Sequence, residues 1–188
     1  MIVINNSIKD AVYEELIKHA FNKCNVVMFV SKEIGFNDND ITILRKNMAE
    51  LENRFKNDFI SQAKRPSWVF SKNINDNNTY SNEEFNNLFK VYFYKFSDAL
   101  KKYLLSNCDL YNWLNPKYPE DIAFFKNGIC WLYSVSHEGI CDIYLESEEE
   151  YNYLKNIGLE FLEENYREIF KEEIYLEELL IDNNEVSE

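Results

Sequence analysis

The sequence predicts an α+β fold with a mainly helical first half, a three-stranded antiparallel β-meander at about residues 121–145 and a helical, acidic C-terminus. Three observations lead to this fold class. Apolar residues recur every three or four positions through much of residues 8–104, the period of an amphipathic helix. The pair Asn127-Gly128 lies between two apolar runs, a pattern typical of a tight β-hairpin. Residues 145–188 hold 15 of the 33 Asp and Glu residues but three of the 20 Lys and Arg residues.

The first helix is predicted to begin at Ser7, because Asp10 three positions later completes a capping box. Apolar residues then follow at helical spacing: Ile8, Val12, Leu16 and Ala20. The next run, Val26–Val30, is short, continuous and rich in branched side chains. It suits a buried strand, with an extension of the helix as the alternative.

Two further helices are predicted in the first half of the chain. The second carries an apolar stripe in steps of three and four and ends at Pro66: Leu44, Met48, Leu51, Phe55 and Phe59. A polar, Asn-rich loop at 71–80 separates it from a third helix at 81–107, which a capping box of Ser81 and Glu84 would open. The middle of this third helix, Val91–Tyr94, is apolar nearly all round and also suits a strand.

The meander is predicted from its two turns. Asn127-Gly128 suits the two positive φ angles of a type I′ turn, and Gly139 marks the second turn after His137-Glu138. With two-residue loops, Phe124 faces Trp131 and Tyr133 faces Tyr144. One sheet face then collects Ile122, Phe124, Trp131, Tyr133, Val135, Asp142 and Tyr144. Both faces are mostly apolar, so either helices cover both faces or one aromatic face remains for a partner.

The C-terminal quarter is predicted to be helical. Ser147 and Glu150 form a third capping box, and Gly158 suits the residue that follows a helix end. A final helix at about 159–180 presents its acidic residues, including Glu164 and Glu168, to solvent. Residues 182–188 are predicted to fray, which leaves residues 1–181 as a single domain.

Composition limits the class, location and partners that we expect for this protein. A chain of 188 residues with 16% aromatic residues is expected to form a real core despite its net charge of −13. It shows neither a secretory signal nor an apolar run of membrane-spanning length, so we expect a cytoplasmic protein without a membrane partner. The four cysteines lack CxxC spacing and are expected to be reduced thiols. The acidic C-terminal quarter would repel a phosphate backbone, which argues against nucleic acid as a partner.

The candidate catalytic and metal-binding patterns are weak. Ser136-His137-Glu138 reads like a triad in letters, but neighbouring strand residues point to opposite faces, so we expect His137 to have a turn role. The predicted register separates Cys130 from Cys141 by about 20 Å, too far for a shared zinc ion or a disulfide. The sequence has no Gly-rich phosphate loop either. We therefore predict no cofactor, no metal and no catalytic residue.

Carboxylates remain the open question. Glu120-Asp121 lie at the entrance to the meander, and Asp142 falls on its aromatic face. An Asp there either lies near a sheet edge or is bonded to a Tyr hydroxyl, or else it is a polar anchor inside a binding surface. Asp142 would be a candidate catalytic acid only with a second group aimed at it.

Part of the meander carries a resemblance. The residues Tyr118-Pro119-Glu120-Asp121, Phe124-Phe125-Lys126-Asn127-Gly128, Trp131-Leu132 and Ser136-His137-Glu138 resemble small uncharacterised proteins of low-GC Gram-positive bacteria. The resemblance covers about residues 118–161 and implies no activity and no catalytic residue. In its type, as a small, acidic, aromatic-rich α+β chain, the protein is also similar to immunity proteins of bacterial toxin systems.

These features favour a non-enzymatic intracellular protein that binds a basic partner protein, with toxin neutralisation as one specific version. The expected contact residues are Phe124, Trp131, Tyr133 and Tyr144, with Asp142, Glu164 and Glu168 as polar contacts. The alternative is a small-molecule-binding protein or enzyme with a pocket between the sheet and the 81–107 helix. The sequence also leaves a homo-oligomer open, in which the aromatic face meets its own copy.

Overall fold

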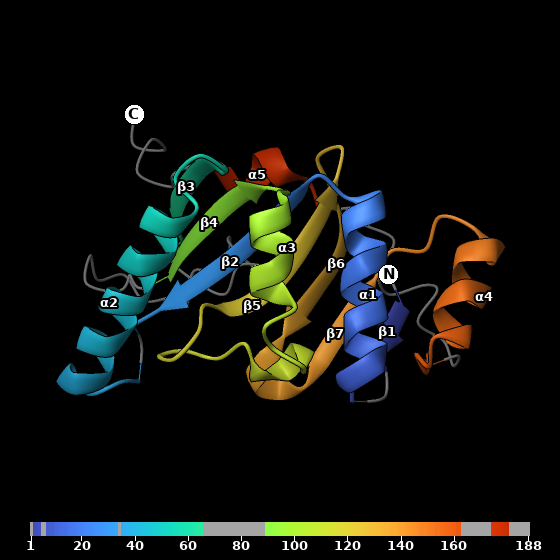
Figure 1. Ribbon diagram of the computed structural model, residues 1–188, viewed down its shortest axis with the longest axis horizontal. Coiled ribbons are helices and arrows are strands. Elements are labelled where there is room, and N and C mark those ends of the chain that lie inside the picture. The colour runs from blue at the N-terminus through green and yellow to red at the C-terminus, as the bar shows by residue number, and fades with distance from the viewer. Residues whose placement is uncertain (1, 5–6, 34, 66–88, 163–173, 181–188) are drawn as a thin grey trace, which may run out of the picture.

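The computed structural model describes residues 2–4, 7–33, 35–65, 89–162 and 174–180, and its centre is one seven-stranded sheet (Figure 1). Every neighbouring pair of strands is antiparallel, and the order across the sheet is β1-β7-β6-β5-β2-β4-β3. The strands are β1 (Ile2–Ile4), β2 (Val26–Lys32), β3 (Phe59–Arg65), β4 (Phe89–Lys95), β5 (Glu120–Lys126), β6 (Ile129–Val135) and β7 (Ile140–Ile143).

Helices lie on both sides of this sheet. Three helices cross one face in Figure 1: α1 (Asp10–Lys23), α2 (Asp38–Arg54) and α3 (Asp98–Leu104). The short α5 (Leu176–Leu180) lies behind the sheet, and α4 (Glu148–Asn156) lies beyond α1 at the end of the molecule. Two one-turn 3₁₀ helices, η1 (Leu110–Asn112) and η2 (Ser136–Glu138), complete the described elements.

Buried apolar side chains form a cluster on each face. The helix-side core lies between the sheet and α1, α2 and α3, and the α5-side core lies on the other face, where Leu176, Leu179 and Leu180 pack. Strand β2 contributes to both, because alternate strand residues point to opposite faces: Val27 and Phe29 enter the helix-side core, and Met28 and Val30 enter the α5-side core. The predicted buried strand at Val26–Val30 is therefore confirmed, and it lies in the middle of the sheet.

The predicted architecture is wrong in its sheet and in its first half. The chain is mixed α and β, but the meander β5-β6-β7 is part of a seven-stranded sheet, and β2, β3 and β4 all come from the half predicted to be mainly helical. Residues 89–95 form β4 instead of the middle of an 81–107 helix, and only 98–104 are helical there. Val91, Phe93 and their neighbours are apolar on both sides because β4 is buried on both faces. The expected pocket between the sheet and an 81–107 helix loses its basis.

Helix starts were predicted with mixed success. Ser147 caps α4 as expected, since its hydroxyl accepts a hydrogen bond from the amide of Glu150 at 3.1 Å. Helix α1 begins at Asp10 after Lys9 without a side-chain cap, so the Ser7 prediction is wrong. The stripe of the second helix is confirmed at Leu44, Met48 and Leu51, but α2 ends at Arg54 and Phe59 opens β3. The predicted Ser81 cap and the 71–80 loop lie outside the described residues.

The first hairpin turn is as predicted, but the register behind it is not. Asn127 and Gly128 have φ angles of 51° and 87°, as a type I′ turn requires. Phe125 pairs with Cys130 and Phe124 pairs with Leu132, so Trp131 is an extra residue on β6 that no residue of β5 pairs with. Such a β-bulge sends Trp131 and Leu132 to the same side, the helix-side core, and moves Tyr133 to the other face.

The second turn is longer than predicted. Val135 pairs with Ile140 and Tyr133 pairs with Asp142, in place of the expected Tyr133–Tyr144 pair. The intervening residues form η2, and Gly139 closes it at a φ of 67°. This four-residue connection places His137 in η2 instead of on a strand, which matters for the candidate site.

Little of the predicted acidic helix is described. Residues 163–173 and 181–188, which include Glu164, Glu168 and the predicted frayed tail, lie outside the described residues. Of the predicted 159–180 helix, Phe161 instead forms a bridge with Ile4, and helical structure is described at α5. None of the described helices is long and apolar enough to cross a lipid bilayer.

Candidate functional site

The predicted aromatic contact residues do not share one surface. Phe124 and Trp131 are 0% and 1% exposed in the helix-side core, so they are unable to touch a partner without unfolding. Tyr133 is half-buried against the α5-side core, and Tyr144 is half-buried after the end of β7. Of the two outcomes expected for the aromatic face, the structure shows the covered one for Phe124 and Trp131.

Asp142 lies across the β6–β7 ladder from Tyr133 and is 3% exposed. Burial raises the pKa of Asp142, and the hydrogen bond with the Tyr133 hydroxyl works against that rise. Burial and this bond together raise the pKa of Tyr133. Asp142 is therefore the buried carboxylate bonded to a Tyr hydroxyl that the sequence allowed as one of two explanations.

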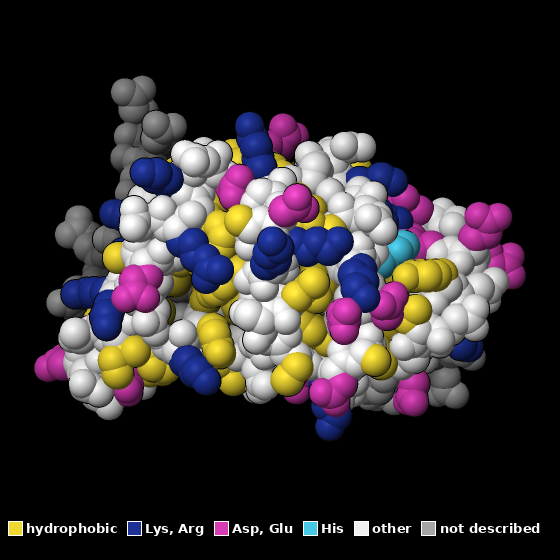
Figure 2. Space-filling model, in the orientation of Figure 1, with side chains coloured by type: hydrophobic (Ala, Val, Ile, Leu, Met, Phe, Trp, Pro, Cys, Tyr) yellow, Lys and Arg dark blue, Asp and Glu magenta, His cyan; other side chains and the backbone are white. Residues whose placement is uncertain are grey.

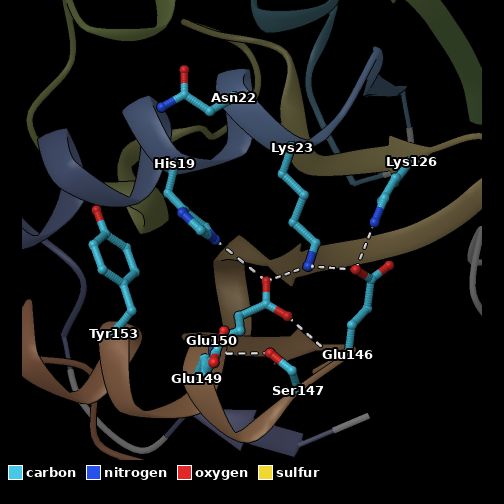
Figure 3. Close-up of a pocket in the computed structure, with 9 residues that line it drawn as sticks. All are labelled: His19, Asn22, Lys23, Lys126, Glu146, Ser147, Glu149, Glu150 and Tyr153. Atoms are coloured by element: carbon cyan, nitrogen blue, oxygen red, sulfur yellow. Dashed lines mark hydrogen bonds and ion pairs between the residues drawn. The ribbon is translucent and has the colours of Figure 1, made fainter.

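An open hollow of about 510 Å³ lies between α1 and α4 (Figure 3). Nine residues line it, from α1, from the end of β5, and from α4 and the residues before it: His19, Asn22, Lys23, Lys126, Glu146, Ser147, Glu149, Glu150 and Tyr153. We call this feature the α1–α4 hollow. Its floor is a network of ion pairs, and its rim carries an aromatic ring.

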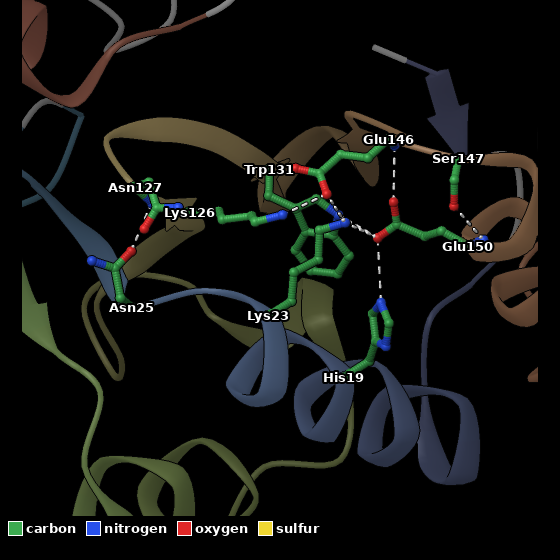
Figure 4. Close-up of polar contacts among 9 residues, drawn as sticks. All are labelled: His19, Lys23, Asn25, Lys126, Asn127, Trp131, Glu146, Ser147 and Glu150. Carbon is green, nitrogen blue, oxygen red and sulfur yellow. Dashed lines mark hydrogen bonds and ion pairs between the residues drawn. The ribbon is translucent and has the colours of Figure 1, made fainter.

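Glu150 is the centre of that network (Figure 4). Its carboxylate accepts hydrogen bonds from Lys23, from Trp131 Nε1 at 3.0 Å and from the Glu146 amide at 2.9 Å, and it lies 3.3 Å from His19 Nε2. Burial raises the pKa of Glu150, but these bonds outweigh it and lower the pKa to about 2. Glu150 is therefore ionised at neutral pH and fixed from four sides.

Glu146 joins the two lysines of the hollow. Its Oε2 atom lies 3.0 Å from the ammonium nitrogen of Lys23 and 2.6 Å from that of Lys126. These bonds lower the pKa of Glu146, chiefly through Lys126. The two lysine charges are thus balanced within the floor, by Glu146 and Glu150.

The rim of the hollow is less constrained than its floor. Tyr153 is 39% exposed, and its ring lies against the His19 ring, with centroids 4.7 Å apart. Glu149, on the same helix, is exposed. An exposed aromatic face beside a carboxylate is an arrangement that suits a cation.

A second polar cluster lies at the start of β5, on residues that the sequence had singled out separately. One ligand-type atom of each of Glu120, Asp121 and His137 lies within 4.8 Å of the others. Glu120 Oε1 lies 3.0 Å from His137 Nδ1, and Glu120 Oε2 accepts a hydrogen bond from Asn115 Nδ2 at 2.9 Å. We call these residues the Glu120–Asp121–His137 cluster.

A bulge in β5 explains why two consecutive residues reach one histidine. Met28 pairs with Ala123 and Val30 with Glu120, so two residues of β5 stand opposite one residue of β2. Asp121, the first of the two, has a φ of 51°, in the left-handed region that Asp tolerates better than most residues. The kink removes the strict alternation that would send Glu120 and Asp121 to opposite faces.

The carboxylates of this cluster are deeply buried. Glu120 is 4% and Asp121 0% exposed. Burial raises the pKa of Asp121 to about 8, against the lowering effect of the Ser136 amide, which donates to Asp121 Oδ1 at 2.6 Å. A buried carboxyl group with a shifted pKa beside a histidine is a feature that recurs at functional sites.

Sequence reasoning noticed Glu120, Asp121 and His137 but did not bring them together. It assumed a two-residue second turn, which would have kept His137 on the sheet. It also saw the Ser147–Glu150 cap without its other partners, because Lys23 and His19 are more than 120 positions away in the chain. Cys130 and Cys141 are buried free thiols on opposite faces of the sheet, outside both clusters.

Comparison with known proteins assigns no function to the α1–α4 hollow or to the Glu120–Asp121–His137 cluster. No protein-family model, no curated protein and no solved structure matches this chain. The geometry of the two clusters is therefore the basis for the functional proposals.

Proposed function

We propose that this protein binds a basic segment of another protein, without catalysing a reaction, and that the α1–α4 hollow receives a Lys or Arg side chain of that segment. The observation that carries the proposal is the rim of the hollow, where the exposed ring of Tyr153 lies on the same helix as exposed Glu149. A cation over that ring would gain attraction from the ring face and from the carboxylate.

The floor of the hollow supports this proposal because it is already ordered. Lys23, Glu146 and Glu150 are held by one another and by His19 and Lys126. A partner therefore loses little free energy to arranging these side chains when it docks. Because Glu146 and Glu150 balance the two lysines, Glu149 gives the hollow its excess negative charge.

The charge of the whole chain favours the same kind of partner. The net charge is −13, and Figure 2 shows acidic side chains gathered over α4, whereas Lys and Arg side chains gather over α3. A field of this sign speeds the approach of a positively charged protein and makes association sensitive to salt. A basic toxin is one specific partner of this class.

A peptide array graded in Lys and Arg content tests the proposal with a defined probe. The tightest basic peptide is then titrated by fluorescence polarisation against the wild-type protein and the double variant Glu149→Gln, Tyr153→Ala. We expect the double variant to bind about fivefold to tenfold more weakly, because it loses one exposed cation–π contact and one exposed ion pair.

The matched control is Glu177→Gln on α5, which removes an exposed glutamate on the other side of the sheet. It should leave the affinity within a factor of about two, since its charge is distant and screened by salt. Equal loss of affinity in both variants would reduce the effect to net charge alone. An array with no preference for basic peptides would contradict the proposal.

A further inference from the structure

We propose that Glu120, Asp121 and His137 bind a divalent transition-metal ion, with Zn²⁺ as the expected ion. The three residues come from the start of β5 and from η2, and each offers a ligand atom within 4.8 Å of the other two. This site is independent of the proposed protein-binding hollow.

The spacing of these atoms fits one small ion. Zinc binds histidine nitrogen and carboxylate oxygen at about 2.0–2.2 Å, so two of its ligand atoms lie no more than about 4.4 Å apart. The 3.0 Å between Glu120 Oε1 and His137 Nδ1 falls inside that limit. Modest adjustments would therefore bring all three atoms to bonding distance of a common centre.

Buried polar atoms without partners point to a missing ligand. Asp121 Oδ2, Ser136 Oγ and Asn115 Oδ1 make no hydrogen bond of ordinary geometry within the described part of the chain, although the Ser136 side chain lies close enough to Asp121 to lower the pKa of that carboxyl. These three residues are 0%, 4% and 9% exposed, and each contacts the cluster: Asn115 bonds Glu120, and Ser136 bonds Asp121. Buried polar groups are nearly always satisfied, so several orphaned atoms in one place need a cause. An ion at Asp121 Oδ2, with a bound water for its neighbours, supplies one.

The neighbours of the cluster are those that hold metal ligands in place. Asn115 donates to Glu120, and the Ser136 amide donates to Asp121. Glu138 Oε1 lies 3.7 Å from His137 Nε2, on the side of the ring away from Glu120. With Nδ1 on the ion, Nε2–H would point to Glu138, the carboxylate–histidine–metal arrangement that fixes the ring tautomer.

The ligand types select the class of metal. An imidazole with two carboxylates suits zinc and its neighbours in the first transition row, whereas calcium and magnesium prefer oxygen ligands alone. None of the four cysteines belongs to the cluster. The expected site therefore has nitrogen and oxygen ligands and no sulfur.

The test is isothermal titration calorimetry of the chelator-treated full chain with ZnCl₂, and with MgCl₂ in parallel. We expect one Zn²⁺ per chain and a rise in unfolding temperature on zinc addition, and no comparable response to Mg²⁺. His137→Ala and Asp121→Asn should each lower zinc affinity by more than about 100-fold, beyond the loss caused by altering an outer-shell partner. A magnesium response equal to that of zinc would overturn the proposed metal class.

The chain offers a matched control, because its other histidine is His19 in the hollow. His19→Ala should bind zinc as the wild type does, and wild-type affinity in His137→Ala would overturn the site. Circular dichroism checks that each variant is folded. If Asp121→Asn fails to fold, His137→Ala decides the question, since His137 is 38% exposed and removable without opening the core.

Cobalt substitution gives a readout that a merely structural role would not move. Co²⁺ bound in the cluster should show visible d–d bands without a thiolate-to-cobalt charge-transfer band, and the visible bands should vanish in His137→Ala. A strong charge-transfer band would place the ion on a cysteine, such as exposed Cys108, and would reject the proposal.

Discussion

Glu150 shows how one side chain can join distant parts of this chain. It caps α4 together with Ser147, and its carboxylate also contacts α1 through Lys23 and β6 through Trp131. Charge-assisted bonds of this kind are stronger than neutral ones, and a carboxylate that accepts several of them holds its charge even when buried. Glu150 thus links α4 to the rest of the molecule.

We expect the ionisation of Glu150 to make the stability of the protein depend on pH. Its pKa in the folded protein is about 2, below the ordinary 4.5, so its contribution is fully present above about pH 4.5 and is lost as the pH falls toward 2. We expect Glu150→Gln to lower the free energy of unfolding by about 2 kcal/mol at neutral pH, the scale of bonds to a charged group. Urea unfolding of both proteins across this pH range measures the difference, which should shrink as the pH falls.

Glu148→Gln is the control for that series, because Glu148 is exposed in the same first turn of α4. It should change the free energy of unfolding by no more than about 0.5 kcal/mol. A Glu150→Gln difference that stays constant from neutral to acid pH would show that lost packing, and not lost charge, causes the effect.

Single residues also limited what the sequence could predict about the site. No residue type in the sequence marks a β-bulge. The extra residue at Trp131 nevertheless moves Tyr133 to the other face of the sheet. The bulge at Asp121 brings two consecutive carboxylates to one histidine. Side chains alternate between the two faces of a sheet only where the strand backbone is regular, and a bulge interrupts that alternation. The sequence therefore identified Glu120, Asp121 and His137 as notable residues but not as neighbours.

At the scale of elements, a helix with one buried face was predicted correctly, whereas β4, one of the strands buried on both faces, was predicted as part of a helix. The stripe at Leu44, Met48 and Leu51 has one apolar side and was recognised as a helix. Strand β4 is buried on both faces, so its residues show no alternation and fit a helical stripe as well. The pairing of β1 could not be predicted from local sequence either, because Ile2–Ile4 pair with β7, about 140 residues later.

The β5–β6 turn gives a clean test of an element that was predicted correctly. Gly128 has a φ of 87°, and an added Cβ would meet nothing within 4 Å, so a substitution there costs only backbone strain. We expect Gly128→Ala to lower the free energy of unfolding by about 1 kcal/mol, and Gly128→Asn by less, since Asn tolerates this conformation. Urea unfolding checks the order, and an equal loss in both variants would contradict a strain-based cause.

At the scale of the whole molecule, the sheet is assembled from both ends of the chain. Strand β2 lies between β4 and β5, and β1 pairs only with β7, so residues 120–143 complete the pairing of the first half. We expect a fragment of residues 1–119 not to fold on its own, because one edge of β2 and the whole of β1 would lack partners. Circular dichroism and thermal unfolding measure this, and a cooperative transition in the fragment would contradict it.

The position of β2 also has a consequence for synthesis on the ribosome. Its first five residues, Val26–Val30, are all apolar, and the strand emerges about 90 residues before β5, which pairs with its second edge. Elongation proceeds at about 5–20 residues per second, so the edge of β2 that later pairs with β5 has no partner strand for several seconds. We expect the nascent chain to be a substrate for chaperones during that interval, and the yield of native protein to depend on how well they shield Val26–Lys32 until β5 is synthesised.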